Sequence, residues 1–176
     1  MIEGARSVTD WLQHATYGVN AKLALVPRDP DDPAPPSLAL IADETRHLHA
    51  ALGLMPDPKQ PDQYPCLLVA EDGTEISNAD PQELGESRVT LLIRYGQRTV
   101  EPAKGLQASC YTLRAVLMSL RELHLPDHEA ARTRNEIQLV VCEQMSLTPL
   151  FQEADDAWVT GAVRVTYLVR DNIPRG

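Results

Sequence analysis

The sequence has no long uninterrupted hydrophobic run, although hydrophobic residues make up 43% of its 176 residues. A membrane-spanning helix needs roughly 18 consecutive apolar residues, and no stretch of this chain approaches that length. The first residues, Met1 to Arg6, also lack the charged-then-apolar pattern of a secretory signal peptide. We therefore expect a globular protein of the cytosol that has no membrane segment.

Cysteine is scarce, and the three residues present are Cys66, Cys110 and Cys142. Their number is odd and their spacing is wide, which argues against a disulfide framework and against a zinc site. Each lies inside a hydrophobic run, and unpaired cysteine is among the most buried residue types. We interpret all three as reduced thiols in the core.

Motifs of catalysis and nucleotide binding are also missing. The chain has no glycine-rich phosphate loop, no dinucleotide-binding glycine turn, no His-Glu-x-x-His helix and no Gly-x-Ser-x-Gly elbow. We predict no cofactor and no enzymatic activity. One enzyme hypothesis stays open, in which Ser109 or Cys110 forms a site with a histidine from elsewhere in the chain.

Two short clusters contain residue types that bind metals. Asp29, Asp31 and Asp32 lie close together, but interleaved prolines and the missing turn glycine do not fit a calcium loop. His47 and His49 have no further ligand at a suitable spacing. We interpret both clusters as solvated side chains and predict no metal site.

Positive charge is in deficit, because 16 Lys and Arg residues stand against 25 Asp and Glu residues, for a formal net charge of −9. This balance argues against general affinity for nucleic acid, since phosphate binding needs a basic face. It favours solubility through mutual repulsion, and it is compatible with a surface that DNA passes without binding.

The clearest pattern that is present predicts a long amphipathic helix from Lys104 to Leu125. Its hydrophobic residues recur at steps of three and four, which places them on one face. Pro102 suits the first turn of this helix, and Pro126 ends it. The apolar face consists of Leu106, Cys110, Leu113, Val116, Leu117, Leu120 and Leu123.

Strands are predicted on both sides of this helix. Arg88–Tyr95 precedes it, and Arg134–Met145 and Trp158–Arg170 follow it, joined across an acidic loop. A helix laid on such a sheet buries one face of each element. We predict that Leu113, Val116, Leu117 and Leu120 pack against Val89, Leu91, Ile93, Leu139, Val141, Val163 and Val165.

The first part of the chain is predicted in shorter pieces. A helix from Ser7 to Tyr17 would be capped by Ser7 and ended by Gly18. The segment Asp43–Leu54 is ambiguous, because Asp43 could cap a short helix or the segment could stay irregular. Strands are predicted over Val19–Val26, Ser37–Ile41 and Tyr64–Ala70.

Three long loops are predicted, at residues 27–36, 55–63 and 71–87. The first has five prolines in ten residues, which makes it stiff and unable to form a helix or a central strand. Long loops on a small core are often functional. We predict that the first and third loops contact partners through Asp29, Asp31, Asp32, Pro33, Pro35, Glu75, Asp80, Glu83 and Glu86.

Together these patterns predict one α+β domain over residues 1–176. Its mixed, mainly antiparallel β-sheet packs against one long helix, with a short N-terminal helix and long loops. The absence of a catalytic constellation indicates a protein whose function is carried by its surface.

The order of these elements resembles the tail terminator family of long-tailed bacteriophages, also called tail completion or neck proteins. The similarity covers most of the chain and is one of pattern and order. It rests on Trp11-Leu12 in the first helix, the strand Tyr64–Val69, the strand Arg88–Ile93 before the long helix, and Leu147–Leu150 and Ala157-Trp158 around the last hairpin.

The resemblance implies a structural virion protein with no cofactor. Family members form a ring, commonly a hexamer, on the head-proximal end of the tail tube, where they stop tube polymerisation. They provide the attachment surface for the head–tail connector, and DNA passes through the ring. The alternatives are another neck or minor tail protein, a small cytosolic enzyme, or a binding module that uses its prolines as an extended ligand.

Overall fold

The computed structural model describes residues 2–52, 54–56, 61–77, 86–123, 136–153 and 156–170, and it confirms the α+β fold class. The helices are α1 (Ile2–Leu12), α2 (Val19–Leu23), α3 (Leu48–Ala51) and α4 (Pro102–Glu122), with a 3-10 turn at Pro61–Gln63. The strands are β1 (Leu40–Asp43), β2 (Cys66–Ser77), β3 (Glu86–Thr99), β4 (Glu136–Glu153) and β5 (Asp156–Arg170).

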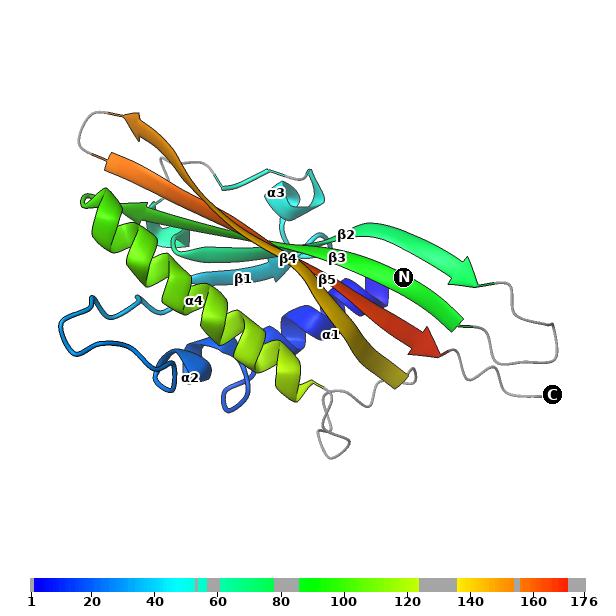
Figure 1. Cartoon of the computed structure of the whole chain (residues 1–176). Helices are drawn as coiled ribbons and strands as arrows, with labels where there is room; N and C mark the ends of the chain where they lie inside the picture. Colours follow the sequence, from blue (N-terminus) through cyan, green and yellow to red (C-terminus); the bar gives the residue numbers. More distant parts are fainter. Residues whose placement is uncertain are drawn as a thin grey trace, which may run out of the picture.

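The strands form one five-stranded sheet in the order β1-β2-β3-β5-β4. Only β1 pairs in parallel, with β2, and the other three pairs are antiparallel. The sheet is therefore mixed and mainly antiparallel, as the alternating sequence predicts. Helices α1, α2 and α4 lie on one side of it and α3 on the other (Figure 1).

The long helix is confirmed, although it runs from Pro102 to Glu122 and not from Lys104 to Leu125. Its buried residues Leu113, Val116 and Leu120 share a core with Leu91, Ile93, Val163 and Val165. Leu117 only borders this core, so it lies at the edge of the apolar face. The side chains of Val89, Leu139 and Val141 lie outside the described part.

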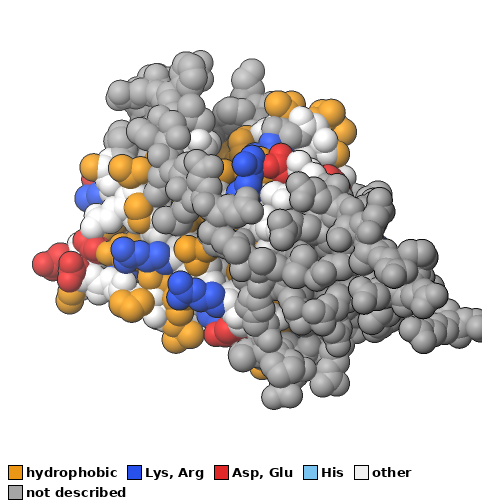
Figure 2. Space-filling view, turned by 45° about the vertical axis from the view of Figure 1, so that its right-hand side comes forward, with side chains coloured by type: hydrophobic (Ala, Val, Ile, Leu, Met, Phe, Trp, Pro, Cys, Tyr) orange, Lys and Arg blue, Asp and Glu red, His pale blue; other side chains and the backbone are white. Residues whose placement is uncertain are grey.

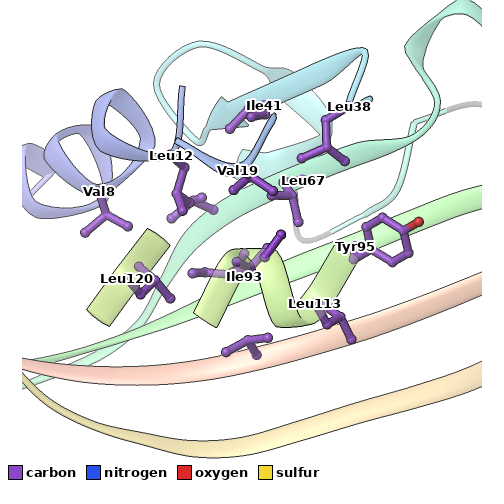
Figure 3. Close-up of a cluster of buried hydrophobic side chains, with 14 of the residues drawn as sticks. Val8, Leu12, Val19, Leu38, Ile41, Leu67, Ile93, Tyr95, Leu113 and Leu120 are labelled. Carbon is purple, nitrogen blue, oxygen red and sulfur yellow. The ribbon is translucent and has the colours of Figure 1, made fainter. Parts of the chain in front are cut away.

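The same core extends under the N-terminal helices. Val8 and Leu12 from α1 and Val19 from α2 belong to one buried cluster with Leu67 and Ile93 of the sheet (Figure 3). The indole Nε1 of Trp11 donates a hydrogen bond to the carbonyl of Ser119 at 2.7 Å, which fixes α1 against α4. The indole is buried and its N–H has a hydrogen-bond partner, so Trp11 holds α1 in one position relative to α4.

The strand predicted over Val19–Val26 is wrong, because Val19–Leu23 forms helix α2. Val19, Lys22 and Leu23 are its buried residues, and this i, i+3, i+4 spacing defines one helical face. The first helix also differs: α1 spans Ile2–Leu12, so Ser7 lies inside it and does not cap it. Gly18 is the N-cap of α2.

The ambiguous segment contains the short helix α3. His47 caps it by accepting a hydrogen bond from the backbone of His49 at 3.3 Å. Asp43 ends β1 instead, and its carboxylate accepts from the Thr45 amide at 2.9 Å. The strand predicted at Ser37–Ile41 is thus shifted to Leu40–Asp43.

The predicted loop at 71–87 is wrong at residues 71–77 and 86–87, while residues 78–85 lie outside the described part. Strand β2 continues to Ser77 and β3 begins at Glu86, with Glu75 paired to Arg88 and Ser77 paired to Glu86. Likewise, β4 runs on to Glu153 through the stretch that the sequence assigns to a connector. The partner strand supplies backbone hydrogen bonds that outweigh the turn-forming composition of these segments.

Candidate partner-contact surface

The proline-rich loop at residues 27–36 is the part of the predicted contact surface that the structure describes in full. Asp29, Pro30, Asp31, Ala34 and Pro36 are exposed, whereas Asp32, Pro33 and Pro35 are half-buried. The loop follows α2 and runs beside α4 (Figure 1). It therefore combines an exposed acidic part with a part that packs on the protein.

Asp32 fastens this loop to α4. Its carboxylate accepts hydrogen bonds from the side-chain amide of Gln107 and from the hydroxyl of Tyr111. These two donors are four residues apart, so they lie on the same face of the helix. Inside the loop, the Asp32 amide donates to the carbonyl of Asp29 at 3.1 Å. We call residues 27–36, fixed in this way, the anchored loop.

The hydrogen bond to Asp32 also changes the acidity of the phenol. It raises the pKa of Tyr111, because the bond favours the protonated hydroxyl beside a carboxylate. The guanidinium of Arg114 lies 5.6 Å from the centre of the same ring. The phenol of Tyr111 therefore stays neutral at physiological pH and keeps its hydroxyl proton for the hydrogen bond to Asp32.

A second fixed point lies in α2, before the anchored loop. Lys22 of α2 is buried, and its Nζ lies 2.6 Å from Oε1 of Glu122 near the end of α4. Residues between Lys22 and Asp32 are consequently held to α4 at both ends. Within this span, Leu25 is 61% exposed.

The other side of the sheet carries a different surface around α3. Leu48, Leu52 and Leu54 are 69%, 59% and 53% exposed, although large hydrophobic side chains are usually buried. Leu48 and Leu52 are four residues apart and so lie on one side of this helical segment. We call these three residues the leucine patch.

Two arginines lie on the same face of the sheet as the leucine patch, and one of them contacts α3. Arg94 Nη2 donates to the carbonyl of Ala50 in α3 at 3.4 Å. Arg164 is exposed on the neighbouring strand, and its Nη2 lies 2.8 Å from Oδ2 of Asp72. On the described part of one face of the molecule, Figure 2 shows Lys and Arg side chains beside both hydrophobic and acidic side chains.

Both edge strands of the described sheet carry features that hinder pairing with a further strand. At the β1 edge, Gln13 Nε2 donates to the carbonyl of Ile41 at 2.5 Å, and the Asn20 side chain bonds both backbone groups of Leu38. These amides occupy groups that a further strand would need. At β4, the pairing with β5 contains three register shifts, and bulges of this kind disturb an edge.

Ser109, Tyr95 and Gln97 form a buried polar cluster between α4 and β3. Ser109 is buried, and its hydroxyl donates to the carbonyl of Gly105 at 2.7 Å and lies 3.1 Å from Oε1 of Gln97. Tyr95 donates to the same Gln97 oxygen, and burial raises the pKa of Tyr95 to about 12. These contacts connect β3 to α4.

The prediction that the cysteines are buried can be checked for Cys66 and Cys110, and it holds for Cys66. Cys66 is buried, and burial raises the pKa of its thiol to about 12, which makes it a poor nucleophile. Cys110 is free but only half-buried, because it lies at the margin of the apolar face of α4.

The predicted contact residues are separated by the fold. Asp29 and Asp31 are exposed, Asp32, Pro33 and Pro35 are half-buried, Glu75 and Glu86 are strand residues, and Asp80 and Glu83 lie outside the described residues. The leucine patch was missed. The only signal for it in the sequence is the i, i+4 spacing of two leucines in a segment too short and mixed to be assigned.

Comparison with protein-family models gives no match, and comparison with curated proteins gives none at a significant level. Among the residues that the structure describes, no group of three or more His, Cys, Asp or Glu side chains is arranged to hold a metal ion. The same residues contain no helix of the length and hydropathy required to cross a bilayer.

Proposed function

We propose that this chain is a phage tail terminator. It forms a ring, of six subunits in the assembled particle, on the head-proximal end of the tail tube. The ring contacts the tail tube protein on one side, ends its polymerisation, and presents the joining surface for the head–tail connector on the other. It belongs to the virion and is assembled in the host cytoplasm.

The observation that carries this proposal is the order of elements shared with that family. A first helix with Trp11, a strand that follows Tyr64-Pro65, a strand joined to a long helix, and a final hairpin occur in the family's order. In the fold these segments build one sheet with α4 across it. Of these segments, α1, β2, β3, α4 and β5 contribute residues to one core, which supports the resemblance in order.

The surfaces of the protein support a role in assembly. A ring that joins two partners needs contact areas on several sides, and the anchored loop and the leucine patch lie on opposite sides of the sheet. Exposed leucines that cluster in this way mark interaction sites more often than isolated ones. The net charge of −9 suits a ring through which DNA slides without binding.

The proposal is tested by adding the purified protein to growing tail tubes that lack their own terminator. Electron microscopy should show added ring density at one tube end, and tube lengths should stop increasing. The same preparation with Cys110→Ala should cap tubes equally well, because the terminator proposal gives this thiol no chemical role. Tubes that keep growing and carry no end density would refute the terminator role.

A further inference from the structure

The anchored loop and the leucine patch lie on opposite sides of one sheet. Leu67 and Val69 of β2 pack in the core under α4, whereas the intervening Leu68 packs with Ala50 of α3 on the other side. Side chains along a strand alternate in this way, so α3 and the α4 layer cannot share a face. Figure 1 shows α2 and the loop on the α4 side, across the sheet from α3.

The two surfaces differ in charge in a way that favours their contact. The anchored loop has three aspartates against one arginine, and Asp29 and Asp31 are exposed. Beside the leucine patch, Arg94 donates to α3, whereas Arg164 on the next strand is paired with Asp72. The acidic loop, with the apolar Leu25 before it, thus matches an apolar patch that has Arg94 beside it.

The anchored loop is also held in place before any partner arrives. The salt bridge of Lys22, before the loop, and the hydrogen bonds to Asp32, within it, tie this stretch to α4 at two points, and proline limits the backbone between Pro27 and Pro36. A preformed projection loses little conformational entropy on binding, which leaves more of the contact energy as affinity.

We propose that the leucine patch of one subunit receives Leu25 and the anchored loop of the next copy of this chain. This inference rests on the proposed ring. Two different, complementary patches on opposite sides of a protomer make a heterologous contact, and such contacts close into rings when the rotation between copies allows it. The amide-capped β1 edge is compatible with assembly through patches and not through one continuous sheet.

The contact is tested by placing a photo-crosslinking amino acid at position 48 of the full chain, in place of the 69%-exposed Leu48. Rings assembled on tail tubes are irradiated, and the linked peptides are identified by mass spectrometry. We expect links from position 48 to residues 25–36 of a neighbouring copy. The matched control places the same amino acid at Val100, which is 73% exposed and lies outside both surfaces.

Two charge variants complete the test. Asp29→Lys with Asp31→Lys should lower the fraction of ring-capped tubes by about tenfold or more, as expected for the centre of an interface. Leu48→Asp should do the same, and Val100→Asp should not. Melting temperatures close to that of the unchanged protein would exclude misfolding as the cause.

The outcomes separate this contact from the ring itself. Rings that form normally while position 48 links only to other partners, or to no copy of residues 25–36, overturn the contact and leave the terminator proposal standing. Tubes on which the unchanged protein forms no ring overturn both. Full capping by Leu48→Asp and by the double aspartate variant also overturns the contact.

Discussion

At the scale of single residues, Gly18 shows how a local contact decides a helix start. A methyl group at this position would lie 2.4 Å from the carbonyl oxygen of His14 and 2.5 Å from that of Leu12. Both are backbone atoms, so the chain between α1 and α2 would have to move. We expect Gly18→Ala to destabilise the protein by about 1–3 kcal/mol, measured by urea unfolding.

Gly73 provides the matched control for that substitution. Nothing lies within 4 Å of a methyl group built there, and the residue is exposed in β2. We expect Gly73→Ala to change stability by less than about 0.5 kcal/mol. Equal losses in the two variants would show that the close approach at Gly18 is not what requires glycine.

The link between Asp32 and Tyr111 makes a prediction about pH. The pKa of Tyr111 is raised above the ordinary value of 10.0, chiefly by its hydrogen bond to Asp32. Because the folded pKa exceeds the unfolded one, the resulting stabilisation is complete below about pH 10 and is lost as pH rises through the folded pKa. Absorbance titration, with Tyr111→Phe to assign the signal, should show the pKa of Tyr111 falling in Asp32→Ala. An unshifted titration in that variant would contradict the anchoring role.

At the scale of elements, the two leucines of α4 separate the centre of the core from its margin. Leu113 is fully buried, whereas Leu117 is partly buried and only packs against the cluster. We expect Leu113→Ala to cost about 2–5 kcal/mol through the cavity that it leaves. Leu117→Ala should cost less, because solvent and neighbouring side chains can fill the space. Thermal unfolding of both variants measures the two losses of stability. A larger loss for Leu117→Ala than for Leu113→Ala would show that the buried face of α4 is assigned wrongly.

The success of the sequence-based prediction also differs by element. Helix α4 and strand β5 were predictable because hydrophobic residues recur at a regular spacing over many residues in each. The same spacing predicts that Leu113 of α4 and Val163 of β5 lie in the core, together with Ile93 of β3. Helix α2 was not predictable, because the hydrophobic pattern of a five-residue segment fits a strand as well as a helix. The extensions of β2 and β3 were hidden by turn-forming residues, since only the partner strand fixes their conformation.

Long-range anchors were equally invisible in the sequence. Nothing near Asp32 indicates that its carboxylate meets Gln107 and Tyr111 some 75 and 79 positions later. The exposed part of the loop, at Asp29 and Asp31, agrees with what its composition predicts. The exposure of the leucine patch depends on which side of the four-residue helix α3 faces the sheet. Tertiary packing, and not the local sequence, decides which side that is.

At the scale of the whole molecule, the anchored loop should be dispensable for folding and required for assembly. Replacing Asp29–Pro36 with a short Gly-Ser turn removes the Asp32 anchor and the exposed carboxylates, but leaves the core under α4 intact. We expect a folded protein with modestly lower stability that fails to complement a phage lacking its terminator.

Asp32→Ala is the control, because it removes the anchor and keeps the exposed carboxylates. Its titre should therefore fall less than that of the shortened protein, since a loosened loop pays more conformational entropy to bind but retains its contacts. Full titre with the shortened loop would place the contacts on the helices and strands.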